Sequence, residues 1–308
     1  MPDAFTVGNY CQARIASYPE IERRLRECPT IASFQGIRSS LLALSADTNV
    51  PVQEIAHLLG KDQALTARLL RMVNSVFGGL TVKVSNIEEA IFFLGLRQVH
   101  DLILSAQVFE QMRKPVGNTA YLNWEDIIRH SVASAILCRE VLSISTGLRE
   151  DDTYYLIGLL HNIGKLVMLH VFPEELEVSM GFCESDPSHF EQHERSAFGW
   201  SHADLGSLYL AHNGLPNDIV EAVCFHHAPD QAPANSKLAA GAQLADIIAR
   251  QAGFCCGFEP PPTQPCCQWE EEPAWTLLFG NDPADWKRPH SAVTECLKRL
   301  PALTHGLT

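Results

Sequence analysis

Residues 154–172 read YYLIGLLHNIGKLVMLHVF and form the most apolar stretch of the chain. Its aliphatic residues are interrupted by His161, Asn162, Lys165 and His170. A membrane-spanning helix would have to bury these polar side chains in lipid at a cost of several kcal/mol. We therefore expect this stretch to lie in the core of a helical protein, and we expect neither a transmembrane span nor a membrane partner.

Helical periodicity extends on both sides of this stretch, from Ile21 to Arg250. Apolar residues recur at helical spacing, as Leu65, Leu69 and Val73 do. The sequence has no convincing run of alternating β-branched residues bounded by turns. The pattern predicts an all-α protein.

The periodicity lapses between residues 113 and 123, where Pro115 and Gly117 occur. This break predicts two helical lobes. We expect an N-terminal segment at 1–20, a first helical lobe at 21–114, a second helical lobe at 120–252, and a Cys- and Pro-rich loop with a C-terminal helical segment at 253–308.

The composition is that of a globular protein, with 46% hydrophobic and 19% charged residues in a chain of 308. Such a chain can bury a core without disulfides or a structural metal, and disorder is excluded for most of it. The formal net charge is −13. A surface of that sign repels phosphate backbones and anionic lipid, so nucleic acid is a disfavoured partner.

Ten cysteines are scattered along the chain, with adjacent pairs at Cys255-Cys256 and Cys266-Cys267. These pairs lack the C-x2-C spacing of zinc sites, so we interpret them as incidental. A secretory signal begins with a basic segment followed by an apolar one, and residues 1–18 contain no such pair of segments. The interpretation is a cytoplasmic protein with reduced thiols.

The second predicted lobe contains several residues of the types that ligate metals, each in an apolar helical context. They are His130, His161, Asn162, His202, His226, His227 and Asp246. An unpaired imidazole or carboxylate is costly to bury, so these side chains are expected to converge on one another or on a metal ion. The alternative is that each is hydrogen-bonded independently, and the residues alone leave both interpretations open.

In this order the residues resemble the metal-binding layout of the HD superfamily of phosphohydrolases, whose helical fold gathers such side chains around one or two divalent ions. The first lobe reads KDQALTARLLRMVNS at 61–75 and SNIEEAI at 85–91, and the second reads GWSHADLG at 199–206. These segments are similar to the signature of the HDOD family, the HD-related output domain of bacterial signalling proteins. The resemblance covers roughly residues 31–249 and implies a two-lobed helical body with an HD-type second lobe.

Two departures from the HD pattern bear on activity. Asn162 stands where HD enzymes have an aspartate that ligates, and can bridge, metal ions. A neutral amide is a poorer ligand, so a binuclear centre is not expected. The Gly-Tyr-Pro motif that follows the His-His pair in HD-GYP cyclic-di-GMP phosphodiesterases is also missing after His227. We therefore expect no catalytic residues.

What remains is the hypothesis of a mononuclear site for one divalent ion, namely Fe, Mn, Zn or Mg. Its ligands would be His130, His161 and Asp246, with help from Asn162 and from the three histidines at 202, 226 and 227. Lys165 lies four residues after His161, which predicts that both lie on one helix face. In HD enzymes a lysine at that place could contact phosphate, and otherwise it is a helix-end cation.

Three functions compete. The first is a non-catalytic signalling output or scaffold module that binds a signalling protein partner, with Arg68 and Arg71 as the candidate partner-binding cations. The second is a metal-dependent phosphohydrolase or nucleotide phosphodiesterase, which would take a nucleotide ligand. The third is a DNA-binding regulator with a helix-turn-helix at residues 52–73, which the acidic balance disfavours.

Overall fold

The computed structural model describes residues 19–28, 84–95, 122–148, 152–185, 190–258 and 269–304, together with isolated positions between 70 and 112. Every regular element in these ranges is a helix, so the all-α prediction is confirmed for the part of the chain that is described. None of the described helices is both long and apolar enough to cross a membrane.

The chain divides into two compact units. One comprises residues 1–30 and 115–298, and the other comprises residues 31–114 and 299–308. Helix α2 (Pro19–Leu25) thus belongs to the same unit as residues 115–298, although the sequence groups it with the first predicted lobe. Arg24 explains this placement, because it donates a hydrogen bond of 2.8 Å to the Val171 carbonyl and stacks 4.7 Å above the Phe172 ring. The other unit contains helix α6 (Ile87–Leu94).

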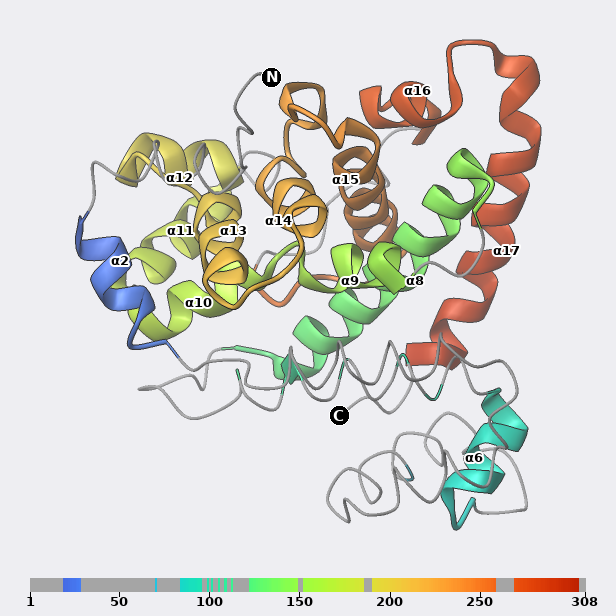
Figure 1. Cartoon of the computed structure of the whole chain (residues 1–308), viewed down its shortest axis with the longest axis horizontal. Coiled ribbons are helices and arrows are strands. Elements are labelled where there is room, and N and C mark those ends of the chain that lie inside the picture. The colour runs from blue at the N-terminus through green and yellow to red at the C-terminus, as the bar shows by residue number, and fades with distance from the viewer. Residues whose placement is uncertain are drawn as a thin grey trace. The chain divides into compact units, whose positions relative to one another are not determined.

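The larger unit is built on helix α8 (Trp124–Thr146), against which α9 (Asp152–Leu160) and α15 (Ser236–Gln251) pack, as Figure 1 shows. Asn123 caps the start of α8 by accepting hydrogen bonds from the amides of Glu125 and Asp126. Gly158 lets α9 approach α8 closely, since a Cβ there would lie 2.5 Å from the Ser134 carbonyl oxygen. This approach brings the end of α9 against the middle of α8.

Between α9 and α15 the chain forms the helices α10 (Ile163–Val171), α11 (Pro173–Ser185), α12 (Phe190–Phe198), α13 (His202–His212) and α14 (Asn217–Cys224). Helices α10 and α13 touch backbone to backbone at Gly164, where a Cβ would lie 1.8 Å from the His202 carbonyl oxygen. The crossing places the residue that begins α13 beside the turn that precedes α10.

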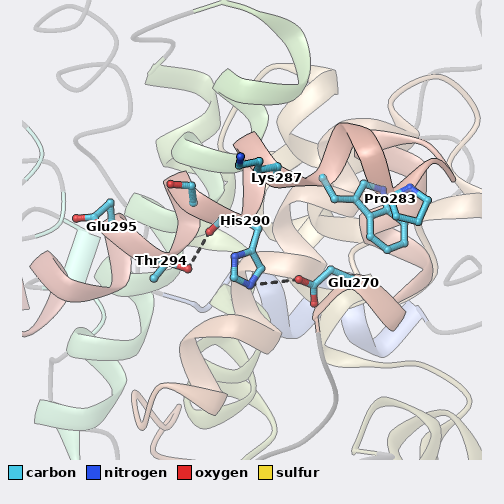
Figure 2. A pocket seen from close by; sticks show the side chains of 8 residues that line it. Glu270, Pro283, Lys287, His290, Thr294 and Glu295 are labelled. Atoms are coloured by element: carbon cyan, nitrogen blue, oxygen red, sulfur yellow. Dashed lines mark hydrogen bonds and ion pairs between the residues drawn. The ribbon is translucent and has the colours of Figure 1, made fainter.

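The C-terminal helices are η3 (Trp269–Glu271), α16 (Pro273–Phe279), η4 (Pro283–Trp286) and α17 (Lys287–Thr304). Helix α16 packs on α15 and contains the fully buried Trp275. Ser145 of α8 donates a hydrogen bond to the Leu278 carbonyl of α16. An open groove of about 510 Å³ lies between η3, η4 and the start of α17 (Figure 2). Glu270 and His290, 3.3 Å apart, lie on its wall.

Candidate metal centre

Three predicted ligands from distant parts of the chain converge in the larger unit. His130 comes from the second turn of α8, His161 from the turn after α9, and Asp246 from α15. Nε2 of His130 lies 3.2 Å from Asp246 Oδ1 and 3.4 Å from Nε2 of His161, and the latter lies 3.6 Å from the same carboxylate oxygen. All three side chains are buried. The predicted convergence is therefore present in the structure.

The protons on the two imidazoles follow from their other contacts. Nδ1 of His130 lies 2.8 Å from the Phe254 carbonyl oxygen, and Nδ1 of His161 lies 2.7 Å from the Gly158 carbonyl oxygen. A carbonyl only accepts, so Nδ1 is the donor in both rings, and a neutral ring then has its lone pair at Nε2. Backbone contacts of this kind orient metal-binding histidines.

Two Nε2 lone pairs and a carboxylate oxygen repel one another unless a proton or a metal ion lies between them. Burial lowers the pKa of His161 despite the nearby carboxylate of Asp246. Burial also disfavours ionisation of Asp246, but hydrogen bonds from His130 and His161, which form when a proton lies at Nε2, together with the Arg250 charge outweigh burial and hold the pKa of Asp246 well below its usual range. The group thus offers one anionic oxygen and two nitrogens to a cation.

This donor set fits a divalent ion that accepts imidazole, such as zinc, iron or manganese. It fits magnesium less well, because magnesium prefers oxygen ligands. When bound, such an ion supplies Lewis acidity and lowers the pKa of a coordinated water. His130, His161 and Asp246 are the residues that would hold it.

Asn162 lies beside this group. Its Nδ2 is 2.7 Å from Nε2 of His161 and 3.4 Å from Nε2 of His130, so the amide donates into the lone pairs. Its Oδ1 is buried and has no hydrogen-bond partner among the described residues. Rotation of the amide by half a turn would exchange these two atoms and direct Oδ1 toward the histidines. Asn162 is thus placed as a neutral neighbour of the candidate ligands.

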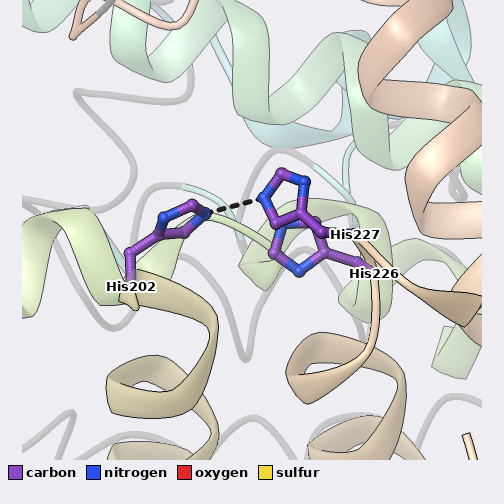
Figure 3. A group of neighbouring side chains, drawn as sticks. All are labelled: His202, His226 and His227. Atoms are coloured by element: carbon purple, nitrogen blue, oxygen red, sulfur yellow. Dashed lines mark hydrogen bonds between the residues drawn. The ribbon is translucent and has the colours of Figure 1, made fainter. Parts of the chain in front are cut away.

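A second group of ligand-type side chains consists of His202, His226 and His227 (Figure 3), and we call it the three-histidine group. His202 begins α13, and the other two follow the end of α14. Nε2 of His202 lies 3.0 Å from Nε2 of His227, and the rings of His226 and His227 are 4.0 Å apart between centroids. His161 links the two groups, since its ring centroid lies 5.4 Å from that of His226.

The three histidines in this group are held neutral. Burial lowers the pKa of His226 to about 3 and lowers the pKa of His202 and His227 well below the usual value. The charge of Lys165 adds to the effect in all three cases. Neutral imidazole is the form that ligates a metal.

Lys165 departs from its prediction. Helix α9 ends at Leu160, and a turn at residues 161–162 precedes α10, so His161 and Lys165 do not share a helix face. Lys165 lies instead in the first turn of α10, where it is almost fully buried, with Nζ 4.3 Å from the centroid of the Phe190 ring. The prediction was wrong because spacing of four implies one face only within an unbroken helix. Arg68 and Arg71, the predicted partner-binding cations, lie outside the described residues.

Sequence reasoning missed Glu194, the acidic side chain closest to the three-histidine group among those described. It is fully buried in α12, and its Oε2 lies 2.6 Å from Nδ1 of His202. The only signal in the sequence is a glutamate eight residues before a candidate ligand. That spacing has no meaning until α12 and α13 are known to fold back on each other.

Known proteins resemble this chain in sequence and in fold. A model of the HDOD domain matches residues 31–229. An uncharacterized protein of Treponema pallidum (strain Nichols) is 28% identical over 198 residues, which are 61% of this chain and 36% of that protein. The chain thus spans about a third of the length of this curated relative.

Two solved structures share the fold. An HDOD domain protein of unknown function from Geobacter sulfurreducens superposes with a TM-score of 0.68 at 22% identity, over 91% of this chain and 97% of that one. A protein from Marinobacter aquaeolei VT8, described as a candidate signal transduction protein, superposes with a TM-score of 0.70 at 18% identity, over 97% of this chain and 66% of that one. Identities this low show the fold alone. Because the family model matches well over half of the residues of this chain, the chain belongs to the HDOD domain family.

Proposed function

We propose that this chain is a non-catalytic output or scaffold module of bacterial signal transduction, which acts in the cytoplasm by binding a protein partner. The observation that carries the proposal is the burial of the candidate ligands: the side chains of His161, His202 and His226 are fully buried, and that of His130 is nearly so. A hydrolytic metal needs an open coordination position that water and substrate can reach. Side chains buried to this degree serve better as a polar core that fixes the shape of the helical unit.

Asn162 supports the same proposal. At the position where the HD pattern has an aspartate, it places a neutral amide beside His161. An amide does not compensate the charge of a second ion, and it weakens the binding of a first one. The aspartate that Asn162 replaces is the ligand that the two ions of a two-metal hydrolytic centre would share.

The alternative function is a metal-dependent phosphohydrolase or nucleotide phosphodiesterase. The observation that favours it is the convergence of His130, His161 and Asp246 with both Nδ1 protons already donated to carbonyl groups. In that case one divalent ion would be held by these residues, and Lys165 would contact phosphate. This alternative requires the buried group to open toward solvent.

Metal analysis and activity assays separate the two. Full-length protein purified without chelators is analysed for bound metals, loaded with Mn²⁺, Fe²⁺ or Zn²⁺, and assayed with cyclic dinucleotides and with phosphomonoesters. We expect at most one ion at the His130, His161 and Asp246 group, and no turnover above the blank. Robust turnover by the loaded, unmodified protein that is abolished by His161→Ala would overturn the proposal in favour of the hydrolase.

A further inference from the structure

Helix α12 presents two side chains to the first residue of α13. Phe190 and Glu194 are four residues apart and so lie on one face of α12. The Phe190 ring contacts the His202 ring at 5.7 Å between centroids. Oε2 of Glu194 lies 2.8 Å from the backbone nitrogen of His202 and 2.6 Å from its Nδ1. One buried carboxylate oxygen therefore holds both the backbone and the ring of His202.

The contact with Glu194 bears on where the proton of the His202 ring lies. With Glu194 ionised, its carboxylate only accepts, so Nδ1 of His202 carries the hydrogen and Nε2 has the lone pair. That lone pair faces Nε2 of His227 at 3.0 Å, which must then be the donor of the contact. Nδ1 of His226 likewise donates to the Val223 carbonyl oxygen at 2.7 Å, and its Nε2 has no hydrogen-bond partner among the described residues. The three-histidine group therefore holds a single ring proton in its interior.

We propose that Glu194 is a positioning residue: it holds His202 in the Nδ1–H form, so that the Nε2 lone pairs of His202 and His226 are available to a divalent transition-metal ion such as Zn²⁺. Binding of the same ion by Nε2 of His227 requires that ring to move its proton from Nε2 to Nδ1. A carboxylate behind a histidine ligand orients the ring and strengthens the donor nitrogen. The inference concerns the same buried polar cluster as the proposed function. It rests on the proposed function in one respect, namely that this cluster fixes the shape of the helical unit.

The charge of Glu194 has a second effect. The buried ammonium of Lys165 lies against Phe190, and its positive charge acts on all three histidines of the group. By itself this charge opposes the entry of a cation. The carboxylate on the same face of α12 offsets it, because opposite charges interact strongly in a buried environment. Glu194 thus has two separable contributions, the hydrogen bond that fixes the ring and the charge that favours the cation.

The first test measures the ring directly. Long-range ¹H–¹⁵N spectra of histidine-labelled, metal-free full-length protein report which ring nitrogen is protonated, and the His202 signals are assigned by their loss in His202→Gln. We expect His202 as the Nδ1–H form, and a shift toward the Nε2–H form in Glu194→Leu. A wild-type ring protonated at Nε2, or an unchanged ring in folded Glu194→Leu, would overturn the inference.

The second test uses Glu194→Gln, which can still accept the hydrogen bond and is expected to fold even if the leucine variant does not. Zn²⁺ is titrated in competition with a chelator and followed through the His202 ring signals. We expect binding weakened about 10- to 100-fold, as for other partners of metal ligands. The matched control is Glu191→Gln, on the same helix, where the carboxylate pairs with Arg195. The inference fails if the wild type does not bind Zn²⁺ at His202, or if Glu194→Gln binds as tightly as Glu191→Gln. Phosphoester turnover would refute the proposed function and leave both ring measurements unaffected.

Discussion

Acidification of the metal-free protein from pH 7 to pH 5 is expected to destabilise the larger unit through His226. Burial lowers the pKa of this side chain from 6.5 to about 3. The unfolded chain therefore binds more protons than the folded one between these values, and stability falls as the pH falls through this window. The loss of stability through His226 reaches its full size only when the pH is below the pKa of His226 in the folded protein.

The magnitude follows from the two pKa values. Between them, each pH unit removes about 1.4 kcal/mol from the free energy of unfolding for one such group. The step from pH 7 to pH 5 lies mostly within this window and costs about 2 kcal/mol for His226 alone. His161, His202 and His227 are shifted in the same direction and add to the slope.

The assay is urea unfolding at several pH values, followed by circular dichroism. Gln can still donate to the Val223 carbonyl but does not titrate, so His226→Gln should reduce the slope of unfolding free energy against pH by about 1.4 kcal/mol per pH unit near pH 5. His290→Gln is the control, because His290 is half exposed on α17. If His226→Gln and the wild type have the same slope in this range, His226 is not held neutral by burial and the reasoning is refuted.

Three further predictions concern the ligands, the helix crossing and the partner. Asn162→Asp should raise the affinity for Mn²⁺ or Zn²⁺, measured by calorimetry, because it adds an anionic oxygen beside His161; an unchanged affinity would contradict the placement of Asn162. Gly164→Ala should destabilise the fold by about 3 kcal/mol or more, because its Cβ would meet the His202 carbonyl, whereas Gly181→Ala on the exposed side of α11 should be neutral or stabilising by up to about 1 kcal/mol in urea unfolding. Arg68→Glu combined with Arg71→Glu should abolish the recovery of a protein partner in a pull-down, whereas a chelator should leave that recovery unchanged; recovery of the same partner by the double variant would exclude these two residues as the binding cations.

The sequence by itself determined the class of the fold and the chemical character of the site. Helical periodicity is a local property of residues three and four apart, so an all-α chain could be predicted without its tertiary contacts. The cost of burying an unpaired imidazole or carboxylate marked a wider set of candidate residues, and the resemblance to the HD pattern then directed attention to His130, His161 and Asp246 among them. The resemblance to the HDOD family followed from contiguous segments, which are visible in any one chain.

Only the tertiary structure decided which of these side chains meet. The contact of His130 with Asp246 depends on how closely α15 approaches α8. The contact of His130 with His161 depends on the approach of α9 to α8, which requires that Gly158 has no side chain. The burial of Glu194 depends on α12 folding back against α13, and the turn at residues 161–162 separates Lys165 from His161. Such contacts join residues far apart in the chain, and their geometry is set by helix crossings that no local pattern encodes.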